Sequence, residues 1–155
     1  MSKITIRPAV SADVLKIQNI VKDAYSVYIE RIGREPAPMT DDYTVHVKAK
    51  RVWVLDTAEG LAGLMVLRME ADHLLVSNVA VERGSQGKGF GRRLLDFADE
   101  FATQNGKSEL RLYTNELMRE NLAIYQKLGW EEYRRAEQDG FRRVFMCKKL
   151  RRSGG

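Results

Sequence analysis

Residues 79–94 run Val-Ala-Val-Glu-Arg-Gly-Ser-Gln-Gly-Lys-Gly-Phe-Gly-Arg-Arg-Leu. The pattern predicts an apolar strand that ends in a glycine-rich turn and continues directly into a helix. The glycines at 87, 89 and 91 leave the backbone N–H groups of the turn uncovered by Cβ atoms. The following helix adds unpaired N–H donors and the positive end of its dipole. The stretch therefore predicts a seat for a phosphate group.

Two common phosphate motifs do not fit this turn. A P-loop needs Gly-Lys followed by Ser or Thr, but Gly89 follows Lys88. A dinucleotide-binding fingerprint needs its third glycine at position 92, which is Arg92, and should come early in the chain. The spacing that remains is Gln86-x-x-Gly89-x-Gly91.

Apolar periodicity predicts the elements on either side of the turn. Strands are expected over 4–7, 51–56, 61–69, 74–81, 109–113, 130–136 and 141–150. Helices are expected after Ser11, over 43–50, from Phe90 to the stop at Asn105-Gly106, and over 117–128. The order β-α-α-β-β-β-α-β-α-β-β predicts an α/β fold whose central sheet is mixed, mostly antiparallel and twisted, with helices flanking it.

The two helices next to the candidate site each have an expected apolar side. The first helix, capped by Ser11, is expected to bury Val14, Ile17, Val21, Ala24 and Tyr28. The later helix is expected to align Leu117, Asn121, Ile124, Tyr125 and Leu128 and to end at Gly129. Between the first two helices, residues 34–42 contain Pro36 and Pro38, which predicts irregular structure.

With these elements in place, Gln86-x-x-Gly89-x-Gly91 resembles the segment of the GNAT superfamily of acetyl-CoA-dependent N-acetyltransferases that holds the coenzyme A pyrophosphate. Taken alone, the pattern would equally fit a plain glycine-rich turn. The resemblance spans about residues 4–150. It implies cofactor contacts by Val79, Ala80, Val81, Gln86, Gly87, Lys88, Gly89, Phe90, Gly91, Arg92 and Asn121.

Residues 115–130 resemble a second family element, Asn-x-x-Ala-x-x-x-Tyr-x-x-x-Gly-Phe, with Ala and Tyr one residue earlier and Trp130 in place of Phe. Asn121 and Tyr125 lie one helical turn apart, so both can point to the same ligand. The resemblance implies that Tyr125 is catalytic and gives a proton to the departing thiolate. Taken alone, Tyr125 would fit a core tyrosine of an amphipathic helix.

The chemistry that the resemblance implies is direct attack of a primary amine on the thioester of acetyl-CoA in a ternary complex. Many relatives carry a glutamate on the fourth strand, but residues 74–81 contain no carboxylate. Water relayed through Ser77, Asn78 or His73, or a carboxylate such as Glu30 or Glu35, is an alternative base. A backbone N–H within 78–80 is expected to meet the oxyanion.

The acceptor is expected to lie against residues 25–43, whose carboxylates can attract a cationic amine. They can equally be solvated surface charges. A small-molecule amine is the expected acceptor, and a peptide amine stays open. A second function class also stays open, namely a non-catalytic acyl-CoA-binding regulatory domain that keeps the cofactor seat without turnover.

Length and composition bear on the number of domains and on binding to nucleic acid or membranes. With 155 residues and 44% hydrophobic residues, the chain fits one domain, expected over 1–150, followed by a basic and disordered tail at 151–155. Residues 141–155 hold six bases and no acid; without them the net charge of +5 becomes −1, which argues against a nucleic-acid partner. No apolar run approaches the roughly 20 residues of a membrane span, and no signal peptide is evident.

The few cysteines and histidines add three expectations. Cys147 is the only cysteine and is expected to be a packed small side chain, which favours a cytoplasmic location. His46 and His73 show no zinc spacing, so no metal is expected. The final strand is expected at the sheet edge, where its lysines would serve either a homodimer, which the family habit favours, or a monomer that discourages edge pairing.

Overall fold

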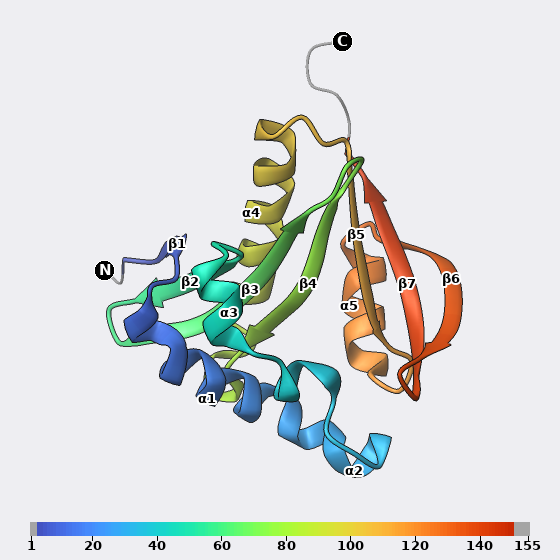
Figure 1. Cartoon of the computed structure of the whole chain (residues 1–155), viewed down its shortest axis with the longest axis horizontal. Coiled ribbons are helices and arrows are strands. Elements are labelled where there is room, and N and C mark those ends of the chain that lie inside the picture. Colours follow the sequence, from blue (N-terminus) through green and yellow to red (C-terminus); the bar gives the residue numbers. More distant parts are fainter. Residues whose placement is uncertain (1–2, 151–155) are drawn as a thin grey trace. The chain divides into compact units, whose positions relative to one another are not determined.

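The computed structural model describes residues 3–150, which form seven strands and five α-helices joined by short 3-10 helices (Figure 1). The strands are β1 (Thr5–Pro8), β2 (Val52–Thr57), β3 (Gly60–Met69), β4 (Leu74–Val81), β5 (Glu109–Asn115), β6 (Glu131–Gln138) and β7 (Phe141–Lys149). The helices are α1 (Val14–Tyr25), α2 (Ile29–Ile32), α3 (Tyr43–Lys48), α4 (Phe90–Gln104) and α5 (Arg119–Lys127). The predicted order of strands and main helices is confirmed.

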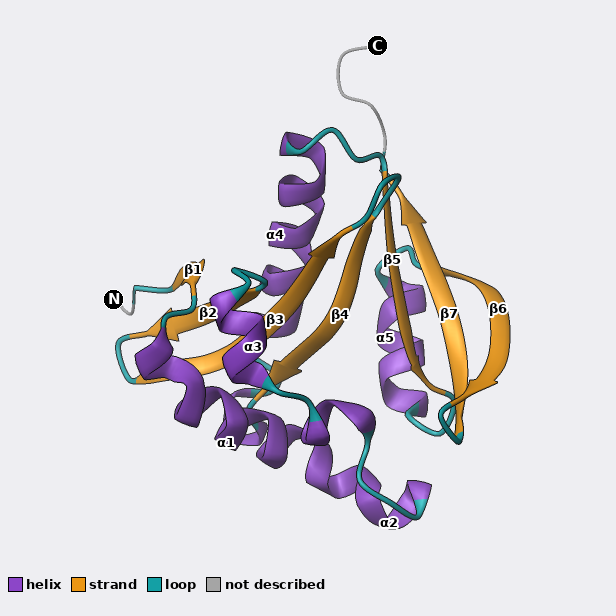
Figure 2. Ribbon diagram, viewed as in Figure 1, coloured by secondary structure: helices purple, strands orange, loops and turns teal. Residues whose placement is uncertain are grey.

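The strands form one mixed sheet in the order β1-β2-β3-β4-β5-β7-β6 (Figure 2). β1 with β2, β2 with β3, β5 with β7 and β6 with β7 pair antiparallel. β4 and β5 run parallel, with Leu74–Val76 opposite Leu110–Leu112. The predicted α/β class with a mixed, mostly antiparallel sheet is therefore confirmed.

The chain divides into two compact units. The first comprises the residues up to Leu67 together with Asn78–Ala98, and the second comprises Arg68–Ser77 together with the residues from Asp99 onward. β4 and α4 contribute residues to both units. The domain boundary at residue 150 stays a prediction, and the predicted basic tail at 151–155 lies outside the described residues.

In the first unit, α1 and α3 lie on one face of the strands and the beginning of α4 on the other (Figure 1). The side chains that α1 buries are Ile17, Ile20, Val21 and Tyr25. Val14, Ala24 and Tyr28, which were expected on this face, are only half-buried. For Tyr28 the reason is that α1 ends at Tyr25 and a 3-10 turn follows over Ser26–Tyr28, which changes the angular spacing of the side chains.

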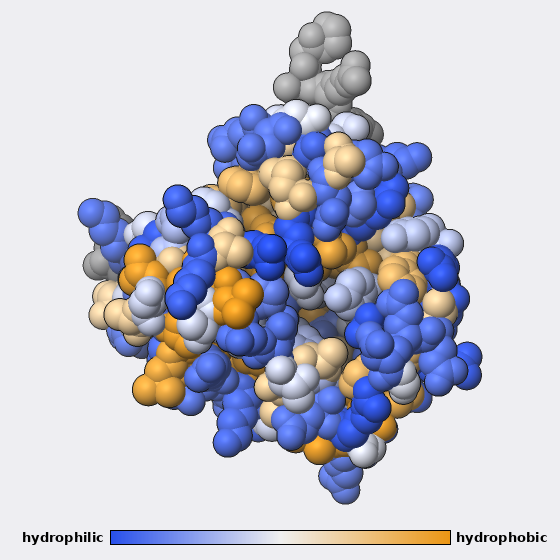
Figure 3. Space-filling view, viewed as in Figure 1, coloured by the Kyte–Doolittle hydropathy of each residue, from blue (hydrophilic) through white to orange (hydrophobic). Residues whose placement is uncertain are grey.

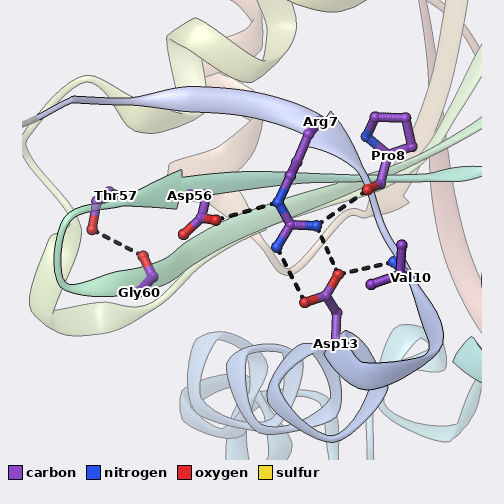
Figure 4. Close-up of polar contacts among 7 residues, drawn as sticks. All are labelled: Arg7, Pro8, Val10, Asp13, Asp56, Thr57 and Gly60. Carbon is purple, nitrogen blue, oxygen red and sulfur yellow. Dashed lines mark hydrogen bonds and ion pairs between the residues drawn. The ribbon is translucent and has the colours of Figure 1, made fainter.

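The start of the first helix is held by Asp13 and not by the predicted Ser11 cap. Ser11 lies inside a 3-10 helix, Ser11–Asp13, so its side chain follows the cap position. The Asp13 carboxylate instead accepts from the backbone N–H of Val10 at 2.9 Å and from the Arg7 guanidinium at 2.9 and 3.2 Å (Figure 4). Arg7 Nε also reaches Asp56 Oδ2 at 3.2 Å, so one guanidinium ties α1 to β1 and β2.

The connection between α1 and β2 confirms the predicted irregularity. α2 ends at Gly33, whose φ of 89° is the left-handed conformation suited to glycine. A 3-10 helix over Ala37–Thr40 then leads to α3, and Asp42 caps α3 by accepting from the N–H groups of Thr44 and Val45. Local hydrogen bonds therefore order this segment.

In the second unit, β7 lies between β5 and β6, so the final strand is not the sheet edge. That prediction is wrong because β7 pairs along its length with β5 and also forms a hairpin with β6. The hairpin turns at Asp139 and Gly140, with φ values of 54° and 83°, as the sequence predicts. The edge strand is β6, whose residues are almost all exposed.

Within residues 3–150 no helix is both long and apolar enough to cross a membrane. Figure 3 shows hydrophobic patches over the region of α1 and α3, among hydrophilic side chains. The exposed large apolar residues of the first unit are Val10, Leu15, Val27 and Val45.

Candidate active site

The glycine-rich turn forms an open cradle at the start of α4. Gly87 and Gly89 have φ values of 87° and 80°, and a Cβ built on either would have no other heavy atom within 4 Å. The carbonyl of Gly89 accepts from the N–H of Arg93 at 3.1 Å, so Gly89 is the residue that caps α4. The N–H groups of residues 90–92 therefore precede the first intrahelical donor and are directed out of the helix end. This arrangement suits an anion.

Phe90, Lys88 and Gln86 take different positions around the cradle. Phe90 is buried, so only its backbone can face a ligand, whereas Lys88 is exposed. The Gln86 amide Nε2 donates to the carbonyl of Val81 at 3.2 Å, which turns this side chain back to the end of β4. The predicted turn is confirmed as a structure, while its contacts with a cofactor stay a prediction.

Asp23 supports the turn from α1. Its carboxylate accepts from the backbone N–H of Arg83 at 2.7 Å. Ser85 Oγ donates to Glu82 Oε1 at 2.8 Å within the same turn. Sequence reasoning missed Asp23 because it lies 60 residues from Arg83 and no local pattern links the two.

The end of β4 packs closely against β3. A Cβ at Gly63 would lie 3.0 Å from the carbonyl oxygen of Ala80, 3.3 Å from Leu94 Cδ1 and 3.4 Å from Val81 Cγ2. Gly63 therefore lets β3 and β4 bring Ala80 and Val81 up to the start of α4. Val79 and Val81 are half-buried and alternate with the buried Asn78 and Ala80.

A chain of hydrogen bonds crosses from α1 through β4 to α3. Tyr25 Oη donates to Asn78 Oδ1 at 2.6 Å and lies 3.1 Å from the carbonyl of Val79. Asn78 Nδ2 donates to Tyr43 Oη at 2.9 Å, and Tyr43 Oη donates to the carbonyl of Pro38 at 2.6 Å. Burial, followed by the charge of Asp41, raises the pKa of Tyr43 well above its usual value.

These contacts decide what Asn78 and Tyr43 can do chemically. An amide is not basic, and a phenol with a raised pKa stays protonated at neutral pH. Ser77 alternates with Asn78 along β4 and faces the other side of the sheet. His73 precedes β4, and its Nδ1 lies 2.7 Å from Asp72 Oδ1. The Asn78 side chain thus links β4 to the two tyrosines, and the relay of a proton through water at Ser77, Asn78 or His73 stays a prediction.

The carboxylates of the expected acceptor segment divide into two kinds. Asp41 Oδ2 lies 2.8 Å from His46 Nε2, and Asp42 caps α3, so both serve the segment's own structure. Glu30 and Glu35 are exposed. The structure therefore favours Glu30 and Glu35 over Asp41 and Asp42 as charges available to a ligand.

In the second unit, α5 places Asn121 and Tyr125 one turn apart, as predicted. Tyr125 is buried, and its ring centroid lies 6.1 Å from that of Trp130. Ile124, which was expected on the same side, is 53% exposed. Ile124 therefore lies outside the buried side of α5 on which Tyr125 lies. That both Asn121 and Tyr125 reach the ligand of the glycine-rich turn stays a prediction.

The lone cysteine and the metal-ligating side chains were the other candidates for chemistry. Cys147 is half-buried in β7, and burial raises the pKa of its thiol, which disfavours the nucleophilic thiolate. Among the described residues, no group of three or more His, Cys, Asp or Glu side chains is arranged to hold a metal ion.

Residues 48–132, more than half of the chain, match the family model described as an acetyltransferase (GNAT) domain. The chain therefore belongs to the GNAT acetyltransferase family, which confirms the resemblance drawn from residues 86–91 and 115–130.

A curated relative and several solved structures are similar to the chain. The uncharacterized N-acetyltransferase YvbK of Bacillus subtilis (strain 168) is 28% identical over 92 residues, and the alignment covers 59% of this chain and 58% of that protein. The chain thus matches less than two thirds of the length of this relative. The ribosomal-protein-S18-alanine N-acetyltransferase of Escherichia coli has a TM-score of 0.77 at 19% identity, covering 98% of this chain and 97% of that one. PaiA N-acetyltransferase of Thermoplasma acidophilum, solved with coenzyme A, has a TM-score of 0.74 at 17% identity, covering 96% and 99%.

Proposed function

We propose that the chain transfers the acetyl group of acetyl-CoA to a primary amine by direct attack in a ternary complex. The observation that carries this proposal is the open cradle at Gly87 and Gly89, directly before the 15-residue helix α4. A Cβ would fill the space where a phosphate could approach the backbone N–H groups. Family membership and the coenzyme A in the PaiA structure support the same conclusion.

The residues at the cradle fit a pyrophosphate. The N–H groups from Gly87 to Arg92 would hold its oxygens, and the exposed side chains of Lys88 and Arg92 would add positive charge. The backbone of Val79, Ala80 and Val81 would align the pantetheine arm. Acetyl-CoA, once bound, supplies an activated thioester carbonyl.

Proton transfer needs two groups. An alkyl amine with a pKa near 10.4 is only about one part in two thousand neutral at pH 7, so the acceptor must lose a proton. Its nitrogen then attacks the carbonyl carbon, the C–S bond breaks, and the thiolate takes a proton from Tyr125. The proposed proton acceptor is Glu30, Glu35 or a water molecule relayed through Ser77, Asn78 or His73.

The acceptor is proposed to be a small-molecule amine, with a peptide amine as the alternative. The Escherichia coli structure is of an enzyme named for an alanine of a ribosomal protein, and for this reason peptides are among the acceptors to be tested. We propose a cytoplasmic location, and a homodimer from the family habit. The second function class is an acyl-CoA-binding regulatory domain without turnover.

The test measures thiol release from acetyl-CoA with small amines, amino acids, polyamines and short peptides. Tyr125→Phe removes only the hydroxyl of Tyr125 and should lower turnover at least tenfold while leaving the Kd of acetyl-CoA unchanged. Tyr133→Phe is the matched control, because Tyr133 is 49% exposed on the edge strand β6. Acetyl-CoA binding without thiol release for any acceptor would favour the regulatory domain, and absence of binding would contradict both functions.

A further inference from the structure

We propose that Tyr25, Asn78 and Tyr43 are positioning residues that fix residues 36–43 against β4 and thereby set the affinity for the acceptor. The inference rests on the proposed function, since residues 36–43 belong to the segment proposed to face the acceptor. Its basis is the hydrogen-bond chain from Tyr25 through Asn78 and Tyr43 to the carbonyl of Pro38.

The carbonyl at the end of the chain fixes the direction of every hydrogen bond in it. A carbonyl oxygen can only accept, so the single Tyr43 hydroxyl proton points to Pro38. Tyr43 Oη must then accept from its other partner, which places the amide nitrogen of Asn78 toward Tyr43. The amide oxygen consequently faces Tyr25, which must donate. The Tyr43 proton has one defined acceptor, the carbonyl of Pro38, whereas the Tyr25 hydroxyl donates to Asn78 Oδ1 and also lies 3.1 Å from the carbonyl of Val79.

This polarity makes asparagine the fitting residue at position 78. The side chain must accept from Tyr25 on one side and donate to Tyr43 on the other, and it is 93% buried. Aspartate has no N–H to donate, so Tyr43 would have to turn its proton away from Pro38 to satisfy the carboxylate. An apolar residue would leave both buried hydroxyls without this partner. The role of Asn78 in holding the segment thus disfavours a carboxylate at position 78 of β4.

Residues 36–48 are also held by hydrogen bonds of their own, which remain when the hydrogen bonds of the Tyr43 hydroxyl are removed. Asp42 caps α3, Asp41 contacts His46, and the N–H of Met39 donates to the carbonyl of Pro36 at 3.0 Å. These bonds do not involve the Tyr43 hydroxyl. Removing that hydroxyl should therefore loosen the attachment of the segment to β4 without unfolding α3.

The test compares Tyr43→Phe and Asn78→Asp with the full-length wild-type chain and with Tyr133→Phe as control. In both variants we expect the KM of the acceptor to rise about fivefold or more, with the Kd of acetyl-CoA unchanged. Hydrogen–deuterium exchange should become faster over residues 36–48 and stay unchanged in α4. A merely structural role would lower stability without this split between acceptor KM and acetyl-CoA Kd.

The outcomes separate this inference from the proposed function. Unchanged exchange over 36–48 in a folded Tyr43→Phe protein would overturn the positioning role, as would faster exchange with unchanged acceptor KM. If wild-type protein shows no thiol release with any acceptor, the proposed function fails and the inferred effect on acceptor affinity fails with it. If Asn78→Asp does not fold, Tyr43→Phe decides, because it removes a single oxygen atom.

Discussion

The carboxylate of Asp23 on α1 accepts a 2.7 Å hydrogen bond from the backbone N–H of Arg83, the first residue of the turn after Glu82. One helix thus fixes the path by which β4 enters the glycine-rich turn. Asp23 belongs to no recognisable motif, yet it contacts the turn that precedes the glycines at 87, 89 and 91.

Asp23→Ala is expected to weaken acetyl-CoA binding by about fivefold, because the turn loses a charge-assisted hydrogen bond that holds the cradle in place. Isothermal calorimetry with acetyl-CoA measures the change. Asp23→Asn keeps an acceptor oxygen at the same place and should retain most of the affinity. Equal losses in both variants would contradict the hydrogen-bond explanation.

Gly89→Ala is expected to weaken acetyl-CoA binding at least tenfold, since the new Cβ would occupy the open side of the cradle. Gly106→Ala is the matched control. Its φ is 74°, close to the 80° of Gly89, and its Cβ would also meet open space, but it follows the other end of α4. Both variants should lose a similar stability of about 1–2 kcal/mol from left-handed strain. Normal acetyl-CoA affinity in folded Gly89→Ala protein would contradict the proposal that the glycine-rich turn binds acetyl-CoA.

Gly63→Ala is expected to destabilise the fold by roughly 1–3 kcal/mol, because its Cβ would lie 3.0 Å from the backbone carbonyl of Ala80 and the strands would have to separate. Thermal unfolding should shift downward by about 2–4 °C for each kcal/mol. At Gly84, which has no positive φ, a Cβ would meet no atom within 4 Å, so Gly84→Ala should unfold at nearly the wild-type temperature.

Asp13→Asn is expected to lower stability at pH 7 and to match the wild type in strong acid. The hydrogen bond from Arg7 holds the pKa of Asp13 below its usual value of 3.8. A lowered folded-state pKa gives stability that is present above pH 3.8 and is lost as the pH falls through the folded pKa. Urea unfolding at pH 7 and at pH values below 3.8 measures the difference, which should shrink in acid. A difference that stays constant with pH would rule out this ionic contribution.

Much of the fold could be predicted from local pattern. The turn at Asp139 and Gly140 and the strand over 74–81 follow from backbone preferences that act within a few residues. The errors arose where packing over long distances decides. β7 pairs with β5 as well as β6. Asp13 supplants Ser11 because it accepts hydrogen bonds from Val10 N–H and from Arg7, and Arg7 is itself bonded to Asp56, 49 residues away.

The sequence by itself determined the glycine-rich turn at residues 86–91 and the order of the elements, because glycine conformation and apolar periodicity are local properties of the chain. It also carried the resemblance to the GNAT family that the family model confirms. Only the tertiary structure decided what Asp23, Gly63 and Asn78 do. Asp23 meets a backbone N–H 60 residues away, and Asn78 meets two tyrosines 53 and 35 residues away. A hydrogen bond or a close backbone approach requires folded neighbours, and the spacing of residues along the chain carries no record of them.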